Sequence, residues 1–138
     1  MKFYNALCPA LQNDQIETRR AEPYAYCQFV AGPDHTAFGR AHHPLMTGSS
    51  GCAYFAATQY ILGVRPDFDA LRVDPCVPAD GREFSVVRKW RGATYRIHVV
   101  NPDGVEKGVQ SIEMDGRKVD ALPALPAGSD CRVEVRMG

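Results

Sequence analysis

The sequence lacks the short motifs that most often reveal a protein's chemistry. It contains no P-loop, no G-x-G-x-x-G, no H-E-x-x-H and no G-x-S-x-G pattern, which are the usual signatures of nucleotide binding, zinc proteolysis and serine hydrolysis. It also lacks an excess of either charge, because 16 basic residues balance 16 acidic ones without a polybasic run. Neither nucleic acid nor an anionic membrane surface is therefore an expected partner.

Long apolar segments are missing as well. No run is long enough to span a bilayer, and the first nine residues do not contain the apolar core of a signal peptide. These two absences predict a protein that is not associated with a membrane and that is cytoplasmic. The chain of 138 residues is long enough for one domain or for two small ones.

Paired cysteines are also absent. The five cysteines are odd in number, lie far apart and include no C-x-x-C pair: Cys8, Cys27, Cys52, Cys76 and Cys131. This distribution argues against both a disulfide framework and a zinc site. We therefore expect reduced thiols and no metal site.

The most informative stretch that is present covers residues 42–63. Small hydroxyl-bearing residues and glycines fill its first part, and an almost wholly apolar run of helical length follows, up to Gly63. This pattern predicts a loop that opens a buried helix. The unpaired N–H groups and the dipole at such a helix start can bind an anion such as phosphate. Ordinary capping is the commoner use of the same residues, and both interpretations stay open at this point.

Residues 22–32 also predict a short helix, with Pro23 in its first turn and Gly32 just past its end. Nearly every position is apolar or aromatic, so we expect burial on most sides. Gln28 is a polar exception, and it could bond either a neighbouring backbone group or the hydroxyls of a ligand.

The segments on either side of this predicted helix are less distinctive. Residues 1–20 predict a short helix or turn-rich lead that ends in a solvated polar segment. His42 and His43 are adjacent on a predicted loop, where histidines are more typical of a polar surface than of catalysis.

The second half of the chain has the two-residue alternation of β-strands. Tyr95 is expected to face inward, His98 to lie on the sheet surface with Arg96, and Trp90 to pack against the sheet. An Asp115-Gly116 turn predicts a hairpin. The expected strands cover residues 71–78, which prolines cut off, and residues 84–90, 93–100, 109–114, 117–119 and 132–137. A helical first half followed by an antiparallel sheet or small sandwich defines an α+β fold.

Six motifs in this order resemble a known family: residues 22–29, 43–49, 56–69, 73–78, 90–95 and 101–105. Together they are similar to the C-terminal end of the inverting phosphorylases of glycoside hydrolase family 94, with the cellobiose phosphorylases as the nearest likeness. The resemblance runs from about Tyr4 to Gly138. It implies that residues 1–69 are the terminal helices of an (α/α)6 catalytic barrel and that residues 70–138 are a C-terminal β-rich domain.

The resemblance implies phosphorolysis of a β-linked glucose disaccharide. In that reaction phosphate attacks the anomeric carbon, a carboxylic acid protonates the leaving oxygen, and cellobiose yields α-glucose 1-phosphate and glucose. Inorganic phosphate is then a co-substrate, and no cofactor is implied. Because phosphate is already anionic, the site needs an anion seat in place of the second carboxylate with which an inverting hydrolase activates water.

The family's functional residues transfer to five positions. Thr47 and Gly48 match the pair that binds phosphate, and Gln28 matches the glutamine that lines the sugar and phosphate site. Glu22 and Tyr24 belong to the same motif, where we expect them to shape the site. Two positions depart from the family, because Cys52 and Gly81 stand where tryptophans are usual.

No residue of this chain matches the general acid, which in the family lies upstream of the matched part. The chain alone is therefore expected to be inactive, and no catalytic residue is assigned. The upstream part of the same enzyme or a homodimer partner could complete the site. Two alternatives are a barrel-completing interaction module and a non-catalytic carbohydrate-binding module in which Tyr95 or Trp90 offers a sugar platform. The acceptor sugar is not fixed by these residues.

Overall fold

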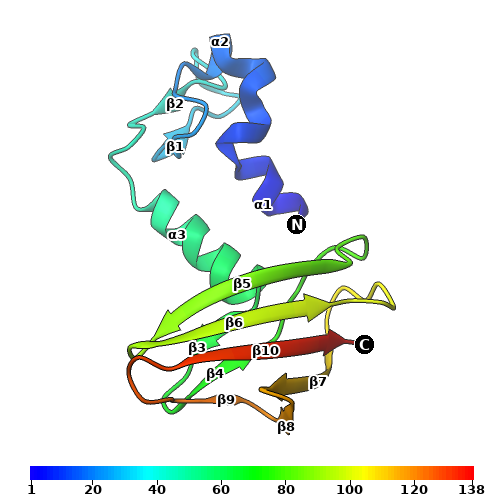
Figure 1. Ribbon diagram of the computed structural model, residues 1–138. Helices are drawn as coiled ribbons and strands as arrows, with labels where there is room; N and C mark the ends of the chain where they lie inside the picture. The colour runs from blue at the N-terminus through cyan, green and yellow to red at the C-terminus, as the bar shows by residue number, and fades with distance from the viewer. The chain divides into compact units, whose positions relative to one another are not determined.

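A computed structural model describes residues 1–138 and divides into two compact units, Met1–Phe55 and Ala56–Gly138 (Figure 1). Together they form a small α+β structure that is mostly sheet with few helices. The helices of a complete barrel are not present. No helix is both long enough and apolar enough to cross a membrane.

The first unit begins with short helices, as expected. The helix α1 (Lys2–Leu7) is followed by the 3₁₀ segment η1 (Pro9–Gln15), and α2 (Ile16–Arg19) ends where Arg20 adopts a left-handed conformation with φ 51°. Pro9 stands at the start of η1, where a missing N–H group costs nothing. The prediction that the end of this lead is wholly solvated is wrong for one residue, because the Arg19 side chain is buried.

The helix expected at residues 22–32 does not form. This segment consists of turns that lead into β1 (Phe29–Val30), which pairs antiparallel with β2 (Ala41–His42). The guanidinium of Arg19 donates hydrogen bonds to the carbonyl oxygens of Glu22 and Ala25, at 3.1 and 2.7 Å. Those carbonyls would accept intrahelical bonds in a helix, so the arginine stabilises the turn instead.

The helix expected after residue 48 does form. It consists of α3 (Ser49–Phe55) and a π-helical continuation, η2 (Ala56–Ile61), and the chain turns away at Gly63 with φ 71°. The expectation of burial is wrong, because neither α3 nor η2 contains a buried residue. An apolar helix is buried only where a second layer covers it, and its own unit supplies no such layer over α3.

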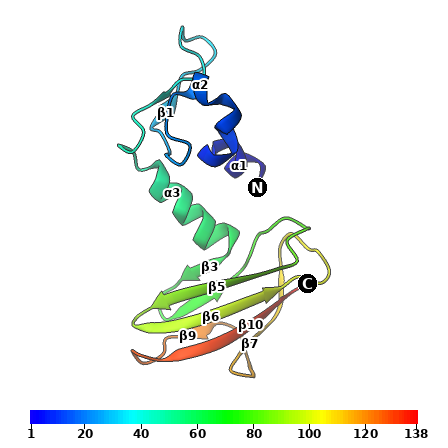
Figure 2. The ribbon, with the colours of Figure 1, turned by 45° about the horizontal axis from the view of Figure 1, so that its top comes forward.

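The second unit contains two sheets (Figures 1 and 2). The expected strands are confirmed, except that the strand expected at residues 71–78 ends at Val73. A three-stranded sheet has the order β3-β4-β9, and a five-stranded sheet has the order β5-β6-β10-β7-β8. Their bounds are β3 (Val64–Pro66), β4 (Ala70–Val73), β5 (Glu83–Trp90), β6 (Ala93–Val100), β7 (Val109–Met114), β8 (Arg117–Val119), β9 (Leu122–Pro123) and β10 (Asp130–Met137).

The five-stranded sheet is not wholly antiparallel, which corrects the expectation. The strand β10 pairs antiparallel with β7 but parallel with β6, with Asp130 opposite Thr94 and Arg136 opposite Val100. The chain crosses from β8 through β9 in the other sheet before it enters β10, so β10 arrives in the same direction as β6.

The core of the second unit lies between these sheets, and Tyr95 is its largest fully buried side chain. The Tyr95 hydroxyl donates a hydrogen bond to the Pro123 carbonyl at 2.7 Å and accepts one from the Leu125 N–H at 3.1 Å. Trp90 is partly buried against the same core, with its ring 6.3 Å from that of Tyr95. The inward positions of both aromatics are confirmed, and burial of Tyr95 rules out a sugar platform there.

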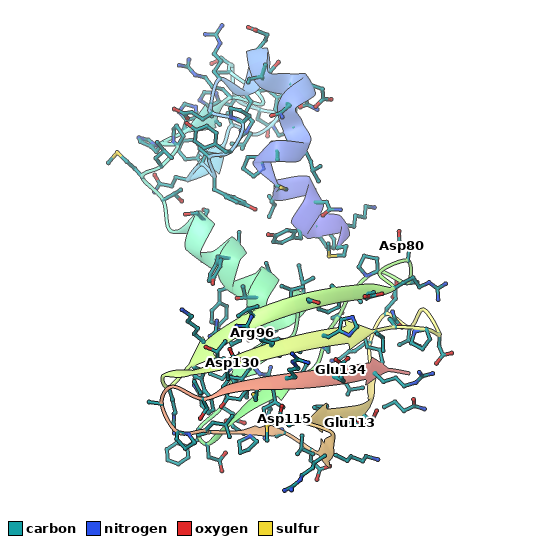
Figure 3. The ribbon with its side chains drawn as sticks, in the orientation of Figure 1. Asp80, Arg96, Glu113, Asp115, Asp130 and Glu134 are labelled. Carbon is teal, nitrogen blue, oxygen red and sulfur yellow. The ribbon has the colours of Figure 1, made fainter.

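The opposite face of the five-stranded sheet is polar. Arg96 and Asp130 form a bidentate ion pair across β6 and β10, with its shortest contact at 2.8 Å (Figure 3). His98 lies on the same face between Glu83 at 2.9 Å and Glu134 at 2.7 Å. The surface position expected for His98 is confirmed. The five cysteines are all free thiols, as expected.

Candidate functional site

The segment that contains Gln28 lies beside the segment that leads to Thr47 and Gly48. The backbone N–H of Gln28 donates to the His42 carbonyl at 3.0 Å, and the N–H of Leu45 donates to the Tyr26 carbonyl at 3.4 Å. These bonds extend the β1-β2 ladder, in which Phe29 faces His42. The two predicted site segments are thus antiparallel neighbours within the first unit, although they are separated by a loop of residues 31–40.

Thr47 and Gly48 form the start of α3. The Thr47 hydroxyl oxygen accepts a hydrogen bond from the Ser49 N–H at 3.0 Å and donates one to the Ser49 hydroxyl at 2.8 Å. The first helical bond runs from the Cys52 N–H to the Gly48 carbonyl. The Thr47 hydroxyl therefore satisfies the N–H of the first residue of α3, and the exposed Gly48 brings bare backbone to the start of the helix.

The backbone between β2 and α3 is held in an unusual conformation. His43 and Leu45 adopt left-handed conformations with φ 51° and 68°, although neither is glycine. Such conformations cost on the order of 1 kcal/mol or more each in a non-glycine residue. They fold the chain sharply enough for residues 43–48 to turn from the strand into the helix. The exposed Leu45 and Met46 side chains lie in this turn.

The histidines of this region form a ring cluster rather than a simple polar surface. The His42 ring stacks on Phe29 with a centroid distance of 4.6 Å and an interplanar angle of 7°. The rings of His43 and His35 lie 6.3 and 6.4 Å from that of His42. Nε2 of His42 is buried without a hydrogen-bond partner, whereas His43 is exposed. Buried polar atoms normally have a hydrogen-bond partner, so Nε2 of His42 is available to a ligand or to water.

Arg19, which is only 5% exposed, donates hydrogen bonds to backbone carbonyls of the motif at residues 22–28. Glu22 has one buried carboxylate oxygen without a hydrogen-bond partner, and Tyr24 is 75% exposed. Burial, with a contribution from the nearby Tyr4 hydroxyl, raises the pKa of Tyr26 to about 12, so this phenol stays neutral. The role of Arg19 was not predictable from the sequence, because an Arg-Arg pair in a polar segment is typical of a solvent-exposed surface.

This arrangement can bind an anion but does not contain a pair of carboxylates for acid and base catalysis. It combines a helix start, exposed glycine backbone, an amide side chain and imidazoles, and Glu22 is the single carboxylate of its two segments. Hydrogen-bond donors of this kind suit phosphate and sugar hydroxyls.

Comparison with known proteins shows what this chain is similar to. Residues 1–63 match the model of the catalytic domain of the glycosyl hydrolase 94 superfamily. The whole chain is 59% identical over 138 residues to the N,N'-diacetylchitobiose phosphorylase of Vibrio furnissii, and 56% identical over 139 residues to that of Vibrio proteolyticus. A 3-O-beta-D-glucopyranosyl-beta-D-glucuronide phosphorylase of Paenibacillus borealis is 41% identical over 106 residues, which cover 75% of this chain.

These similarities agree with the resemblance to glycoside phosphorylases that the sequence motifs carry. It spans only 17% of the length of each of the two Vibrio relatives and 14% of that of the Paenibacillus relative. The finer likeness to the cellobiose phosphorylases is not reproduced among these relatives, whose names specify other sugars.

Proposed function

We propose that this chain is the C-terminal portion of an inverting β-glycoside phosphorylase and contributes the phosphate seat and part of the sugar site. The observation that carries the proposal is the adjacency of residues 22–28 to residues 43–48. In the family resemblance these two motifs supply the phosphate and sugar contacts. The chain's similarity to two phosphorylases over its whole length supports the same conclusion.

Each residue has a distinct part in the proposed site. The N–H groups at Gly48 and in the first turn of α3 donate hydrogen bonds to the phosphate oxygens, and the Thr47 hydroxyl donates a further one. The Gln28 amide bonds both phosphate and a sugar hydroxyl. Glu22 and Tyr24 shape the wall of the site. The phosphate oxygen attacks the anomeric carbon as the glycosidic oxygen leaves, and a carboxylic acid from outside this chain supplies the proton to that oxygen.

The substrate of the complete site is a β-linked disaccharide with phosphate as co-substrate. Identities of 59% and 56% to the diacetylchitobiose phosphorylases favour N,N'-diacetylchitobiose over the cellobiose suggested by the sequence motifs. Phosphorolysis of that disaccharide would release an α-configured N-acetylglucosamine 1-phosphate and free N-acetylglucosamine.

The surface of the first unit is typical of a protein segment that packs against further protein. Most of the exposed large apolar side chains of the molecule lie in this unit, including Phe3, Leu7 and Leu11 at helical spacing. Buried polar atoms of Arg19, Glu22 and His42 lack partners in the same unit. Exposed apolar surface on this scale is typical of an interface. The remainder of a catalytic domain, in the same or in another polypeptide, would cover it.

A chimera tests the proposal directly. In it, this chain replaces the homologous 17% of the Vibrio furnissii phosphorylase, and release of sugar 1-phosphate from N,N'-diacetylchitobiose and phosphate is measured. We expect an active chimera in which Thr47→Val raises the KM for phosphate at least about tenfold, because a direct hydrogen bond to a charged group is lost. Cellobiose in place of N,N'-diacetylchitobiose tests the choice of disaccharide.

The matched control is Thr36→Val, an exposed threonine in the loop between β1 and β2. It should leave the KM for phosphate unchanged. If Thr47→Val and Thr36→Val behave alike in an active chimera, the proposed phosphate seat is wrong. Isothermal titration calorimetry of phosphate binding to the isolated chain shows whether the phosphate seat forms without the rest of the domain.

A further inference from the structure

Six side chains form two adjacent rows on the polar face of the five-stranded sheet (Figure 3). The strands β5, β6 and β10 each contribute one residue to each row. Their registers place Val87, Arg96 and Arg132 side by side in one row, and Ser85, His98 and Glu134 side by side in the next. These residues line a hollow of about 200 Å³ that is open to solvent. Pockets for drug-sized ligands measure roughly 300–1,000 Å³, so this hollow suits a ligand with a single ring.

Two guanidinium groups lie next to each other in the first row. Arg96 and Arg132 are register partners on neighbouring strands, which are about 4.8 Å apart, and like charges at this spacing repel each other. The Asp130 carboxylate bonds only Arg96, with Nε and Oδ1 2.9 Å apart. The guanidinium of Arg132 makes no hydrogen bond or ion pair within the chain, since only its backbone N–H is bonded, to Asp115. An anion between the two arginines would relieve their repulsion.

The one carboxylate that lines the hollow does not oppose an anion. Oε2 of Glu134 lies 2.7 Å from Nδ1 of His98, and Nε2 of the same ring lies 2.9 Å from Oε1 of Glu83. Hydrogen bonds to Glu83 and then to Glu134 raise the pKa of His98, so the protonated ring compensates the charge of Glu134. The two arginines therefore give the lining of the hollow a net positive charge.

The same hollow also offers contacts that suit a sugar ring. The Ser85 hydroxyl can donate or accept a hydrogen bond, and Oε1 of Glu134 is free to accept one from a sugar hydroxyl. Val87 is 59% exposed, and its methyl groups can cover the apolar C–H face of a pyranose. Cationic and sugar-compatible groups thus lie side by side in the two rows.

We propose that this hollow is a binding site for a phosphorylated monosaccharide. The phosphate group lies between Arg96 and Arg132, and the ring covers Val87 with its hydroxyls bonded to Ser85 and Glu134. Guanidinium groups bind phosphate through charge-assisted hydrogen bonds, and a dianion suits two of them better than a carboxylate of single charge. The site lies entirely in the second unit, so it is independent of whether the first unit binds phosphate.

A titration of the full chain with α-D-glucose 1-phosphate, followed by amide NMR spectra, tests the site. We expect the signals of the three strands to shift around the hollow with a single dissociation constant. Arg132→Gln should raise that constant about tenfold or more, because a hydrogen bond to a charged group is lost. Val87→Glu places a carboxylate opposite Arg96 and should abolish binding by repelling the phosphate.

Arg136→Gln is the matched control, because it makes the same charge change on the same strand and face but outside the hollow. It should leave the dissociation constant within about twofold of the original. Thr47→Val alters the phosphate seat of the first unit and should leave these shifts unchanged, so failures of the two sites are distinguishable. Inorganic phosphate and glucuronate should each bind more weakly, and neutral methyl α-D-glucoside should not bind measurably.

A spectrum of the full chain that glucose 1-phosphate leaves unchanged overturns the proposal. So does equal weakening by Arg132→Gln and Arg136→Gln, because the anion would then respond only to net charge. Equal binding of inorganic phosphate would contradict the sugar contacts, and tighter binding of glucuronate would contradict the phosphate contacts. The dispersion of each variant's own spectrum establishes that it is folded.

Discussion

Two residues of β6 show how the position of a residue in a strand determines the role of its side chain. Tyr95 points inward, is fully buried and holds the β9-β10 connection through hydrogen bonds to Pro123 and Leu125. His98, three residues later, lies on the polar face between two carboxylates that belong to β5 and β10. One tyrosine therefore joins the two sheets, and one histidine joins three strands of a single sheet.

The His98 contacts predict a pH dependence of stability. Hydrogen bonds to Glu83 and then to Glu134 raise the pKa of His98 above its ordinary value of 6.5. Because folding favours the protonated ring, the stabilisation is fully present below about pH 6.5 and is lost as the pH rises through the higher pKa of the folded state. His98 is 34% exposed and Glu83 68% exposed, so solvent screening limits each pair to about 0.5 kcal/mol.

An NMR titration of the His98 ring measures this pKa directly. Glu83→Gln and Glu134→Gln should each lower it, and together they should bring it close to the ordinary value. Glu106→Gln changes an exposed loop carboxylate and serves as the control. A pKa of His98 at or below 6.5 in the unsubstituted chain would contradict the prediction.

At the scale of elements, the end of η2 depends on Gly63. A β-carbon there would overlap the backbone of Asp74 and Pro75, and its φ of 71° disfavours any other residue. Gly116, in the turn between β7 and β8, has a similar φ of 78° but no neighbouring atom within 4 Å of the β-carbon position. The two glycines share a backbone requirement and differ only in the space around them.

Alanine substitution at both positions separates these two costs. We expect Gly116→Ala to lower the free energy of unfolding by about 1 kcal/mol, the cost of a left-handed conformation. Gly63→Ala should lower it by about 3 kcal/mol or more, because β4 must move away from the end of η2 as well. Urea denaturation measures both values. Equal losses would show that the close approach of Asp74 can relax.

The elements that were predictable are those with a local pattern. Alternation identified β6 and β10, a β-rich run before a short turn identified β5, and the Asp115-Gly116 turn identified the hairpin of β7 and β8. Alternation does not specify the direction of a neighbouring strand, so the parallel pairing of β10 with β6 was missed. The prediction of a helix at residues 22–32 was wrong because Arg19 donates hydrogen bonds to the carbonyl oxygens of Glu22 and Ala25. A side-chain contact of this kind leaves no pattern in the local sequence.

The candidate site was predictable only in part for the same reason. Sequence resemblance identified Gln28, Thr47 and Gly48, and the start of α3 followed from its capping residues. The strand pairing that brings the two motifs together, the strained backbone at His43 and the stacking of His42 on Phe29 depend on contacts across a loop.

At the scale of the whole molecule, stability is divided unequally between the units. The hydrophobic core of the molecule, including its large buried side chains such as Tyr95, Leu71 and Ile97, lies entirely in the second unit. The buried hydrophobic residues of the first unit are four alanines: Ala21, Ala25, Ala31 and Ala41. Four alanine side chains bury too little apolar surface to offset the conformational entropy of 55 ordered residues.

This division predicts that residues 56–138 fold alone. The isolated second unit should unfold cooperatively on heating and give a dispersed amide NMR spectrum, whereas residues 1–55 should give neither result. The same comparison on the chimera with the Vibrio phosphorylase should show residues 1–55 protected from amide exchange, because the rest of the domain covers them. A cooperative transition in isolated residues 1–55 would contradict this account.

The central position of β10 also sets an order of assembly for the second unit. The hairpins β5-β6 and β7-β8 can each form from neighbouring residues, but in the sheet β10 lies between them, and β10 follows them both in the chain. Hairpins of this kind form within microseconds, and contacts between distant segments form more slowly. The two hairpins therefore cannot join into one sheet until Asp130–Met137 pairs with both of them. A ribosome-bound chain that still lacks these eight residues would expose both halves of an unfinished sheet.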